Sequence, residues 1–153
     1  MYFLEQLVAE WYALRGFFVR TNVLFGRREQ GGYEGEIDVA AFNPRTKELI
    51  HLEISMDADS WNQRKERFEK KFKAAERHYR SVFDFEYKEI KKVAVVSWAR
   101  PKQEINFGDD IELLTIPDLV NKIKAYLTKI NSTNTMIPEG YPLMRAIQFA
   151  LWF

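Results

Sequence analysis

The sequence contains no cysteine and only two histidines, His51 and His78. A chain without cysteine forms no disulfide and no thiolate zinc site, so a reducing cytoplasm is the expected compartment. Two histidines also cannot supply a histidine-rich metal site. Any bound metal would therefore be held mainly by oxygen atoms, which favours Mg²⁺ or Mn²⁺.

Long hydrophobic runs are missing as well. No apolar stretch reaches the roughly 18 residues that a membrane span needs, and the first ten residues lack the basic start and apolar run of a signal peptide. The net charge of +1 favours no class of partner by itself. We therefore expect no membrane association and a cytoplasmic location.

The chain does have the material for a packed core. Of its 153 residues, 46 % are hydrophobic and 15 % aromatic, which favours a single packed domain over a disordered chain. Helical spacing of apolar residues predicts a helix over 3–15, which Gly16 would end. Aromatic and β-branched residues predict a strand over 17–25, and four glycines predict a mobile surface loop over 26–35.

The most informative stretch is 35–55, which reads GEIDVAAFNPRTKELIHLEIS. Its alternating pattern predicts two strands, 36–42 and 48–55, joined by turn residues. Asp38 lies on the face of the first strand opposite the apolar residues, which are Ile37, Val39 and Ala41. Glu53 holds the equivalent place on the second strand, so the pattern brings two carboxylates together on neighbouring strands.

A basic helix is predicted next, over roughly 60–81, with Asp59 or Ser60 as its cap. An apolar stripe marks its buried face, formed by Trp61, Phe68, Phe72, Ala75 and Tyr79. Its eight basic residues, against three glutamates, are Arg64, Lys65, Arg67, Lys70, Lys71, Lys73, Arg77 and Arg80. A basic excess of this kind is typical of a surface that binds phosphate, although a solvated helix face has the same composition.

The rest of the chain alternates again between strand and helix. Strands are predicted over 92–98 and 111–116, and a helix over 118–130. We divide the chain into an α/β domain, residues 1–131, and a linker with an apolar C-terminal segment, residues 132–153. That segment is expected to dock on the domain or to join two subunits as a homodimer. Helices on both sides of a mixed sheet suit this order of elements.

Several of these segments together resemble the PD-(D/E)XK nuclease superfamily, in particular its Holliday-junction-resolvase-type members. They are the first helix with its early glutamate, the Gly16-Phe17 step, GEIDVAAF and LIHLEIS, and the resemblance spans roughly residues 3–98. It implies an α/β restriction-endonuclease-like fold with an α-β-β-β-α-β core. A central mixed sheet would be flanked by helices, here with an extra C-terminal helix.

The resemblance also implies a metal site. Asp38 and Glu53 would hold Mg²⁺ or Mn²⁺ by carboxylate oxygens, with help from the backbone carbonyl of Ile54. The glutamate that the superfamily carries on its first helix matches Glu5 best. Glu10 is the alternative, but it lies about 140° further around an ideal helix, so the two cannot both face one ion.

A lysine of the superfamily is missing from its usual place. In the superfamily this lysine stands two residues after the strand glutamate, and this chain has Ser55 at that position. The basic or amide group would then come from the next helix, where the candidates are Gln63, Arg64, Lys65, Lys70 and Lys71. We favour Gln63 and Lys65 because they lie nearest the helix start. The other possibility is that the chain has kept binding and lost cleavage.

Two basic regions are candidates for contact with nucleic acid. They are the glycine-rich segment, with Arg27 and Arg28, and the basic helix, with Arg64, Lys70, Lys71 and Lys73. The predicted function is a metal-dependent nuclease that hydrolyses phosphodiester bonds in DNA, with RNA as another substrate to test. The alternative is an inactive nuclease-fold module that binds nucleic acid or a protein partner.

Overall fold

The structure is a computed structural model that describes residues 2–56, 58–97, 110–130 and 134–153. The helices are α1 (Phe3–Leu14), α2 (Trp61–Glu76), α3 (Tyr79–Val82), α4 (Ile116–Thr128) and α5 (Pro142–Trp152). The strands are β1 (Phe18–Arg27), β2 (Tyr33–Phe42), β3 (Leu49–Ser55), β4 (Ile90–Val96) and β5 (Ile111–Thr115). The predicted domain boundary at residue 131 and the last residue of the predicted strand 92–98 lie outside these ranges.

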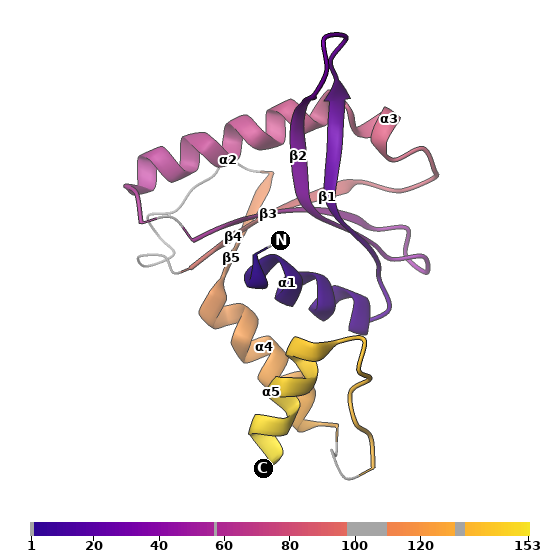
Figure 1. The fold of residues 1–153 in the computed structure, drawn as a ribbon, viewed down its shortest axis with the longest axis vertical. Coiled ribbons are helices and arrows are strands. Elements are labelled where there is room, and N and C mark those ends of the chain that lie inside the picture. Colours follow the sequence, from indigo (N-terminus) through magenta and orange to yellow (C-terminus); the bar gives the residue numbers. More distant parts are fainter. Residues whose placement is uncertain (1, 57, 98–109, 131–133) are drawn as a thin grey trace.

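The strands form one mixed sheet in the order β1-β2-β3-β4-β5. The pairs β1–β2 and β2–β3 are antiparallel, while β3–β4 and β4–β5 are parallel. Helix α2 covers one face of the sheet, and α1 covers the other face with α4 and α5 behind it (Figure 1). The predicted α/β fold class, with helices flanking a mixed sheet and an additional C-terminal helix, is confirmed.

The two faces of the sheet are packed by different clusters of buried residues. On the α1 face, one cluster joins α1 to α4, α5 and the strands, through residues such as Val8, Leu52, Val95, Ile123 and Met144. On the α2 face, Phe68 and Phe72 pack on Ala94 and Val96, and further along Ala75 and Tyr79 pack beside Leu49. Since both faces are covered, polar side chains on the middle strands are shielded from water.

The predicted loop over 26–35 is instead a β-hairpin, so that prediction was wrong. Strand β1 continues to Arg27, and β2 already begins at Tyr33. The turn between them is closed by the amide of Arg28, which donates to the carbonyl of Gly32 at 2.9 Å. Gly31 and Gly32 have φ angles of 99° and 78°, which glycine adopts without steric cost. The glycines therefore serve a tight turn between two paired strands.

The hairpin bends where β2 carries Asp38. Asn22 of β1 has a left-handed φ of 52°, and it lies at the level of Asp38, between the Thr21–Val39 and Val23–Ile37 pairs. Ile37 packs in the cluster that holds Val23 and Ala75, whereas Val39 and Ala41 pack on the α1 side. The predicted shared face of Ile37 with Val39 and Ala41 is thus broken by the bend.

Helix α5 lies against α1 and α4. Met144 is buried in the same cluster as α1 and α4 residues, and its amide donates to Glu10 Oε2 at 2.9 Å. Phe149, Trp152 and Phe153 stay exposed at the far end, and a homodimer through this segment stays a prediction. In the ranges described, no helix has the length and apolar character to cross a bilayer.

Candidate functional site

Asp38 and Glu53 lie side by side where β2 and β3 part. The pairing between these strands runs from Phe42–Leu49 to Val39–Leu52. Beyond that point Asp38 Oδ2 accepts a hydrogen bond from the amide of Ile54 at 2.8 Å. The carboxylate thus takes the place of a backbone partner and is held next to Glu53.

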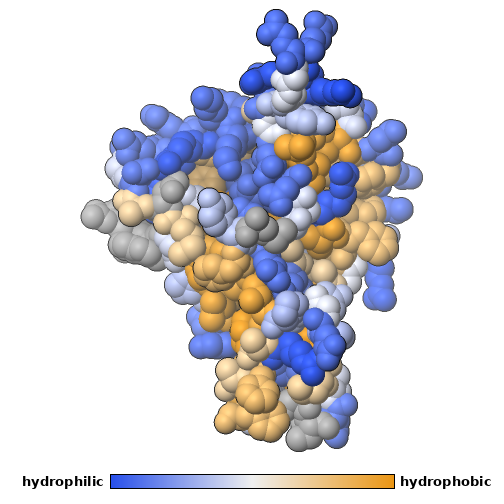
Figure 2. Space-filling view, in the orientation of Figure 1, coloured by the Kyte–Doolittle hydropathy of each residue, from blue (hydrophilic) through white to orange (hydrophobic). Residues whose placement is uncertain are grey.

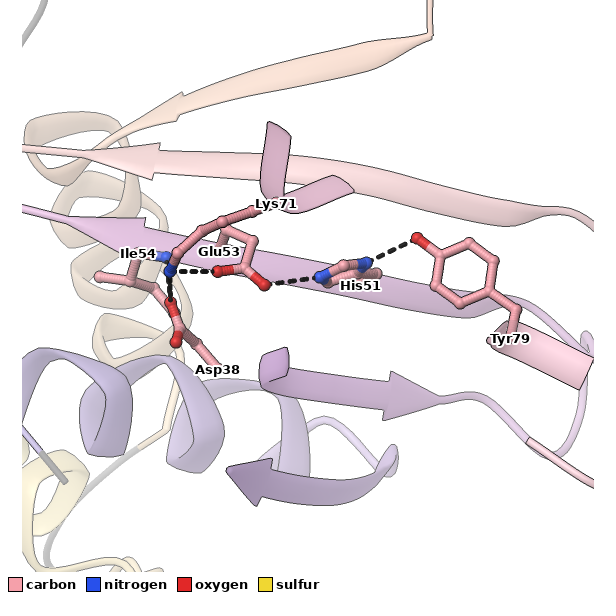
Figure 3. A network of polar contacts seen from close by, with 6 residues as sticks. All are labelled: Asp38, His51, Glu53, Ile54, Lys71 and Tyr79. Carbon is pink, nitrogen blue, oxygen red and sulfur yellow. Dashed lines mark hydrogen bonds and ion pairs between the residues drawn. The ribbon is translucent and has the colours of Figure 1, made fainter. Parts of the chain in front are cut away.

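Lys71 of α2 reaches into this gap from above the sheet (Figure 3). Its Nζ lies 2.7 Å from Glu53 Oε2 and 3.6 Å from Asp38 Oδ2. The Lys71 side chain is 48 % exposed, while the side chain of Glu53 is only 1 % exposed. Lys71 therefore brings a positive charge to the two carboxylates from the open side of the site, while Ser55 sits half-buried at the end of β3.

The structure does not bring Gln63 or Lys65, the preferred lysine substitutes, to the two carboxylates. Gln63 is exposed in the first turn of α2, and Lys65 pairs with Glu69 at 3.9 Å. Helix α2 runs back along β3, because its later residue Ala75 packs near Leu49, at the start of that strand. Gln63 lies about 12 Å before Lys71 along an ideal helix axis, so the third turn and not the first faces Glu53.

A second buried polar chain leads away from Glu53. Its other oxygen, Oε1, is 2.8 Å from His51 Nε2, and His51 Nδ1 is 2.6 Å from the hydroxyl of Tyr79. Burial lowers the pKa of His51 to about 3, so the imidazole is neutral. Burial also raises the pKa of Tyr79, so its hydroxyl keeps its proton.

Burial raises the pKa of both carboxylates. The pKa of Asp38 is raised to about 6, first by burial and then by the charge of Glu53, against the opposing effects of the Ile54 amide and Lys71. Burial raises the pKa of Glu53 as well. The pKa of Lys71 is lowered by burial, but the charges of Glu53 and Asp38 outweigh this and raise it overall. The site thus favours a bound positive charge.

Glu5 and Glu10 of α1 have separate roles. Glu5 is 7 % exposed, and its Oε2 has no hydrogen-bond partner among the described residues. Its pKa is raised by burial and then by the charge of Asp38, which places it toward the site. Glu10 instead accepts hydrogen bonds from Gln6 Nε2 and from the Met144 amide, both at 2.9 Å. Glu10 therefore anchors α5, and Glu5 stays the predicted glutamate of the site.

The donor set suits a hard divalent cation. Asp38 and Glu53 offer carboxylate oxygens, which are the ligands that Mg²⁺ and Mn²⁺ prefer. Lys71 balances one of the two negative charges of Asp38 and Glu53. Within the described ranges no three acidic, histidine or cysteine side chains are close enough to form a metal site on their own. An ion here would need the carbonyl of Ile54 or water as further ligands.

The predicted nucleic-acid contacts fall into two groups. Arg27 and Arg28 are exposed near the hairpin turn, and Lys70 and Lys73 are exposed on α2. Hydrophilic side chains cover the hairpin tip and α2 (Figure 2). Between them lies a groove of about 610 Å³, lined by Arg28, Glu34, Glu66, Glu69, Lys70, Lys73, Ala74 and Arg77.

Arg64 and Lys71 do not belong to that exposed basic surface. Arg64 is 8 % exposed, and its guanidinium lies 5.3 Å from the ring centre of Trp61. It shares the buried stripe of Phe68 and Phe72, to which the helical period carries it. Lys71 points to the acidic site. The spacing of Phe68 and Phe72 puts Lys71 at the edge of the buried stripe, but it does not show which turn of α2 lies over Glu53.

Comparison with known proteins establishes the fold and nothing beyond it. No family model matches the chain, and no curated protein matches it. A solved structure described as a crystal structure of a protein of unknown function, AF1548, is similar with a TM-score of 0.52 and 17 % identity. The similarity covers 90 % of this chain and 72 % of that one.

Proposed function

We propose that this protein is a metal-dependent nuclease that hydrolyses phosphodiester bonds in DNA. The observation that supports the proposal is the meeting of Asp38, Glu53 and Lys71 where β2 and β3 part, with Lys71 Nζ 2.7 Å from Glu53. This grouping resembles the acidic pair and lysine of the PD-(D/E)XK superfamily, with the lysine supplied by α2.

Asp38 and Glu53, with the carbonyl of Ile54, would hold Mg²⁺ or Mn²⁺. When bound, such an ion lowers the pKa of a coordinated water and neutralises charge on the phosphate. Lys71 keeps its proton because its pKa is raised. It therefore orients water and stabilises negative charge as a hydrogen-bond donor and not as a base. We infer that Glu5 serves as the proton acceptor, because its buried Oε2 has no hydrogen-bond partner among the described residues.

The substrate would approach from the side of the hairpin and α2. Arg27, Arg28, Lys70 and Lys73 are among the exposed cations there, and contacts of this kind bind phosphates without reading bases. We infer DNA as the substrate, with RNA tested beside it. The lack of cysteine supports a cytoplasmic setting.

Cleavage assays test the proposal directly. The purified chain is incubated with Mn²⁺ and supercoiled, linear, single-stranded or branched DNA, or with RNA. We expect cleavage of DNA that Asp38→Ala and Glu53→Ala each abolish. Glu112→Ala is the matched control, because Glu112 is a strand carboxylate paired with Lys91 and outside the site. A folded wild-type protein that cuts none of these substrates would contradict the proposal.

One observation favours an inactive binding module as the second candidate. Lys71 already bridges Asp38 and Glu53, and a lysine–carboxylate pair of this kind can be a structural ion pair with no metal. In this case DNA binding would be the same with and without Mn²⁺. Calorimetric titration of DNA into the protein in each condition separates the two functions.

A further inference from the structure

The buried chain of His51 and Tyr79 behind Glu53 has no part in the function proposed so far. His51 is 0 % exposed, and it lies among the aromatic residues of the α2 face, with its ring 4.6 Å from that of Phe72. An imidazole in such a place is costly unless both ring nitrogens have partners. Here Glu53 and Tyr79 supply one partner each (Figure 3).

These contacts determine which atom donates in each of the two hydrogen bonds of His51. Glu53 Oε1 is a carboxylate oxygen that can only accept from His51, so Nδ1 is the ring nitrogen left to accept from the Tyr79 hydroxyl. The remaining ring proton is then on Nε2 and is donated to Glu53 Oε1 at 2.8 Å. The two contacts thus select the same tautomer.

These hydrogen bonds fix the orientation of the two carboxylate oxygens of Glu53. Oε1 is engaged by His51, while Oε2 faces Lys71 at 2.7 Å. The carboxylate cannot turn about its last bond without losing both contacts. One oxygen is therefore directed away from the site, and the other is presented to it.

We infer that His51, itself held by Tyr79, is a positioning residue that orients Glu53 so that Oε2 alone is offered to a bound cation. The inference rests on the proposed metal site. Residues that orient a metal ligand in this way commonly change metal affinity by about 10-fold to 100-fold when they are replaced.

Mn²⁺ affinity of the full chain, measured by calorimetry, tests the inference with two matched variants. His51→Gln keeps an amide N–H that can donate to Glu53. The double variant His51→Leu with Tyr79→Phe removes the donor and also the hydroxyl that would be left without its partner. We expect the double variant to bind Mn²⁺ about 10-fold to 100-fold more weakly, while His51→Gln stays close to wild type. Thermal unfolding of each variant confirms that it is folded.

Nitrogen NMR of the wild-type imidazoles gives a readout that needs neither metal nor activity. The chain has two histidines, so His78→Asn assigns the signals. We expect His51 to be the neutral tautomer with its proton on Nε2. A proton on Nδ1 with none on Nε2 would overturn the inference whatever the variants do.

The outcomes separate this inference from the function on which it rests. Wild-type Mn²⁺ affinity in a folded double variant would overturn the positioning role and leave the nuclease proposal intact. Failure of the wild-type protein to bind Mn²⁺ would contradict the proposed metal site and, with it, the presentation of Oε2 to a cation.

Discussion

The two faces of the sheet are equally well covered, but they bury different chemistry. On the α1 face the strands contribute apolar residues, such as Val39, Leu52 and Val95, to a continuous hydrophobic cluster. On the α2 face the same strands bury His51 and Glu53, with Asp38 beside them, under the aromatic residues of α2. The two faces therefore share one set of strands and differ in the side chains that they bury.

The difference shows which face serves stability and which serves chemistry. Apolar burial stabilises the fold, at about 25 cal/mol for each Å² removed from water. Buried carboxylates destabilise it unless they are paired, and the raised pKa values of Asp38 and Glu53 show that their pairing is incomplete. A cluster of this kind is typical of a functional site, and the predictions below separate the two faces.

The largest effect is expected from Lys71→Met, which keeps the length of the side chain and removes its charge. Cleavage should fall about 100-fold to 1,000-fold, the usual cost of removing one charge-stabilising donor. Lys70→Met is the matched control, because Lys70 is the preceding residue and lies in the groove outside the site. Rates of DNA cleavage with Mn²⁺ measure the effect, and equal losses in the two variants would contradict a specific role for Lys71.

Leu52→Ala should lower the stability of the protein and leave its activity intact, unlike Lys71→Met. Leu52 is fully buried on the α1 face, so its truncation should lower the free energy of unfolding by about 2–5 kcal/mol. Activity per folded molecule should stay near the wild-type value, because Leu52 points away from the acidic site. Urea unfolding measures the loss of stability, and cleavage rates at low temperature measure the activity. A loss of cleavage in the folded variant would show that the two faces are coupled.

The free energy of unfolding of the protein should depend on pH through Asp38 on the α2 face. The pKa of Asp38 rises from 3.8 to about 6 on folding, so the folded state holds this proton more tightly than the unfolded state does. The resulting stabilisation is complete below pH 3.8 and is lost as the pH rises through about 6. Its size is at most about 3 kcal/mol.

Asp38→Asn removes this titration while it keeps an oxygen that can accept from the Ile54 amide. Urea unfolding over this pH range should therefore show a smaller decline in stability for the variant than for the wild type. Identical pH profiles would mean that Asp38 titrates normally in the folded protein.

The smallest effect is expected at the exposed cations. Removing Arg28 and Lys73 together should weaken DNA binding by a modest factor for every sequence and should lower the slope of log affinity against log salt by about 2. Glu29→Gln, near the same turn, serves as the control. A salt slope unchanged in the double variant would place the nucleic acid elsewhere.

The sequence predicted the acidic pair because strand alternation is a local property. Asp38 and Glu53 each interrupt an apolar pattern of period two, and antiparallel pairing across a short turn brings them together. The α/β class followed from the order of strands and helices in the same way. The bend at Asn22 was not predictable, since a left-handed residue inside a strand leaves no trace in the hydrophobic pattern.

Lys71 and Glu10 could not be placed from local pattern alone. Which turn of α2 lies over Glu53 depends on how the connection after Ser55 returns the helix across the sheet. Glu10 appeared as an alternative to Glu5 because its partner, the Met144 amide, is 134 positions away in the chain. Both cases turn on tertiary contacts that sequence spacing does not encode.

The account depends most on whether the acidic cluster on the α2 face binds a metal. Calorimetric titration of Mn²⁺ into the wild-type protein and into Asp38→Ala is the most direct test. We expect binding by the wild type and none by the variant, with both proteins folded. Equal binding by the two, or no binding by the wild type, would contradict the central claim.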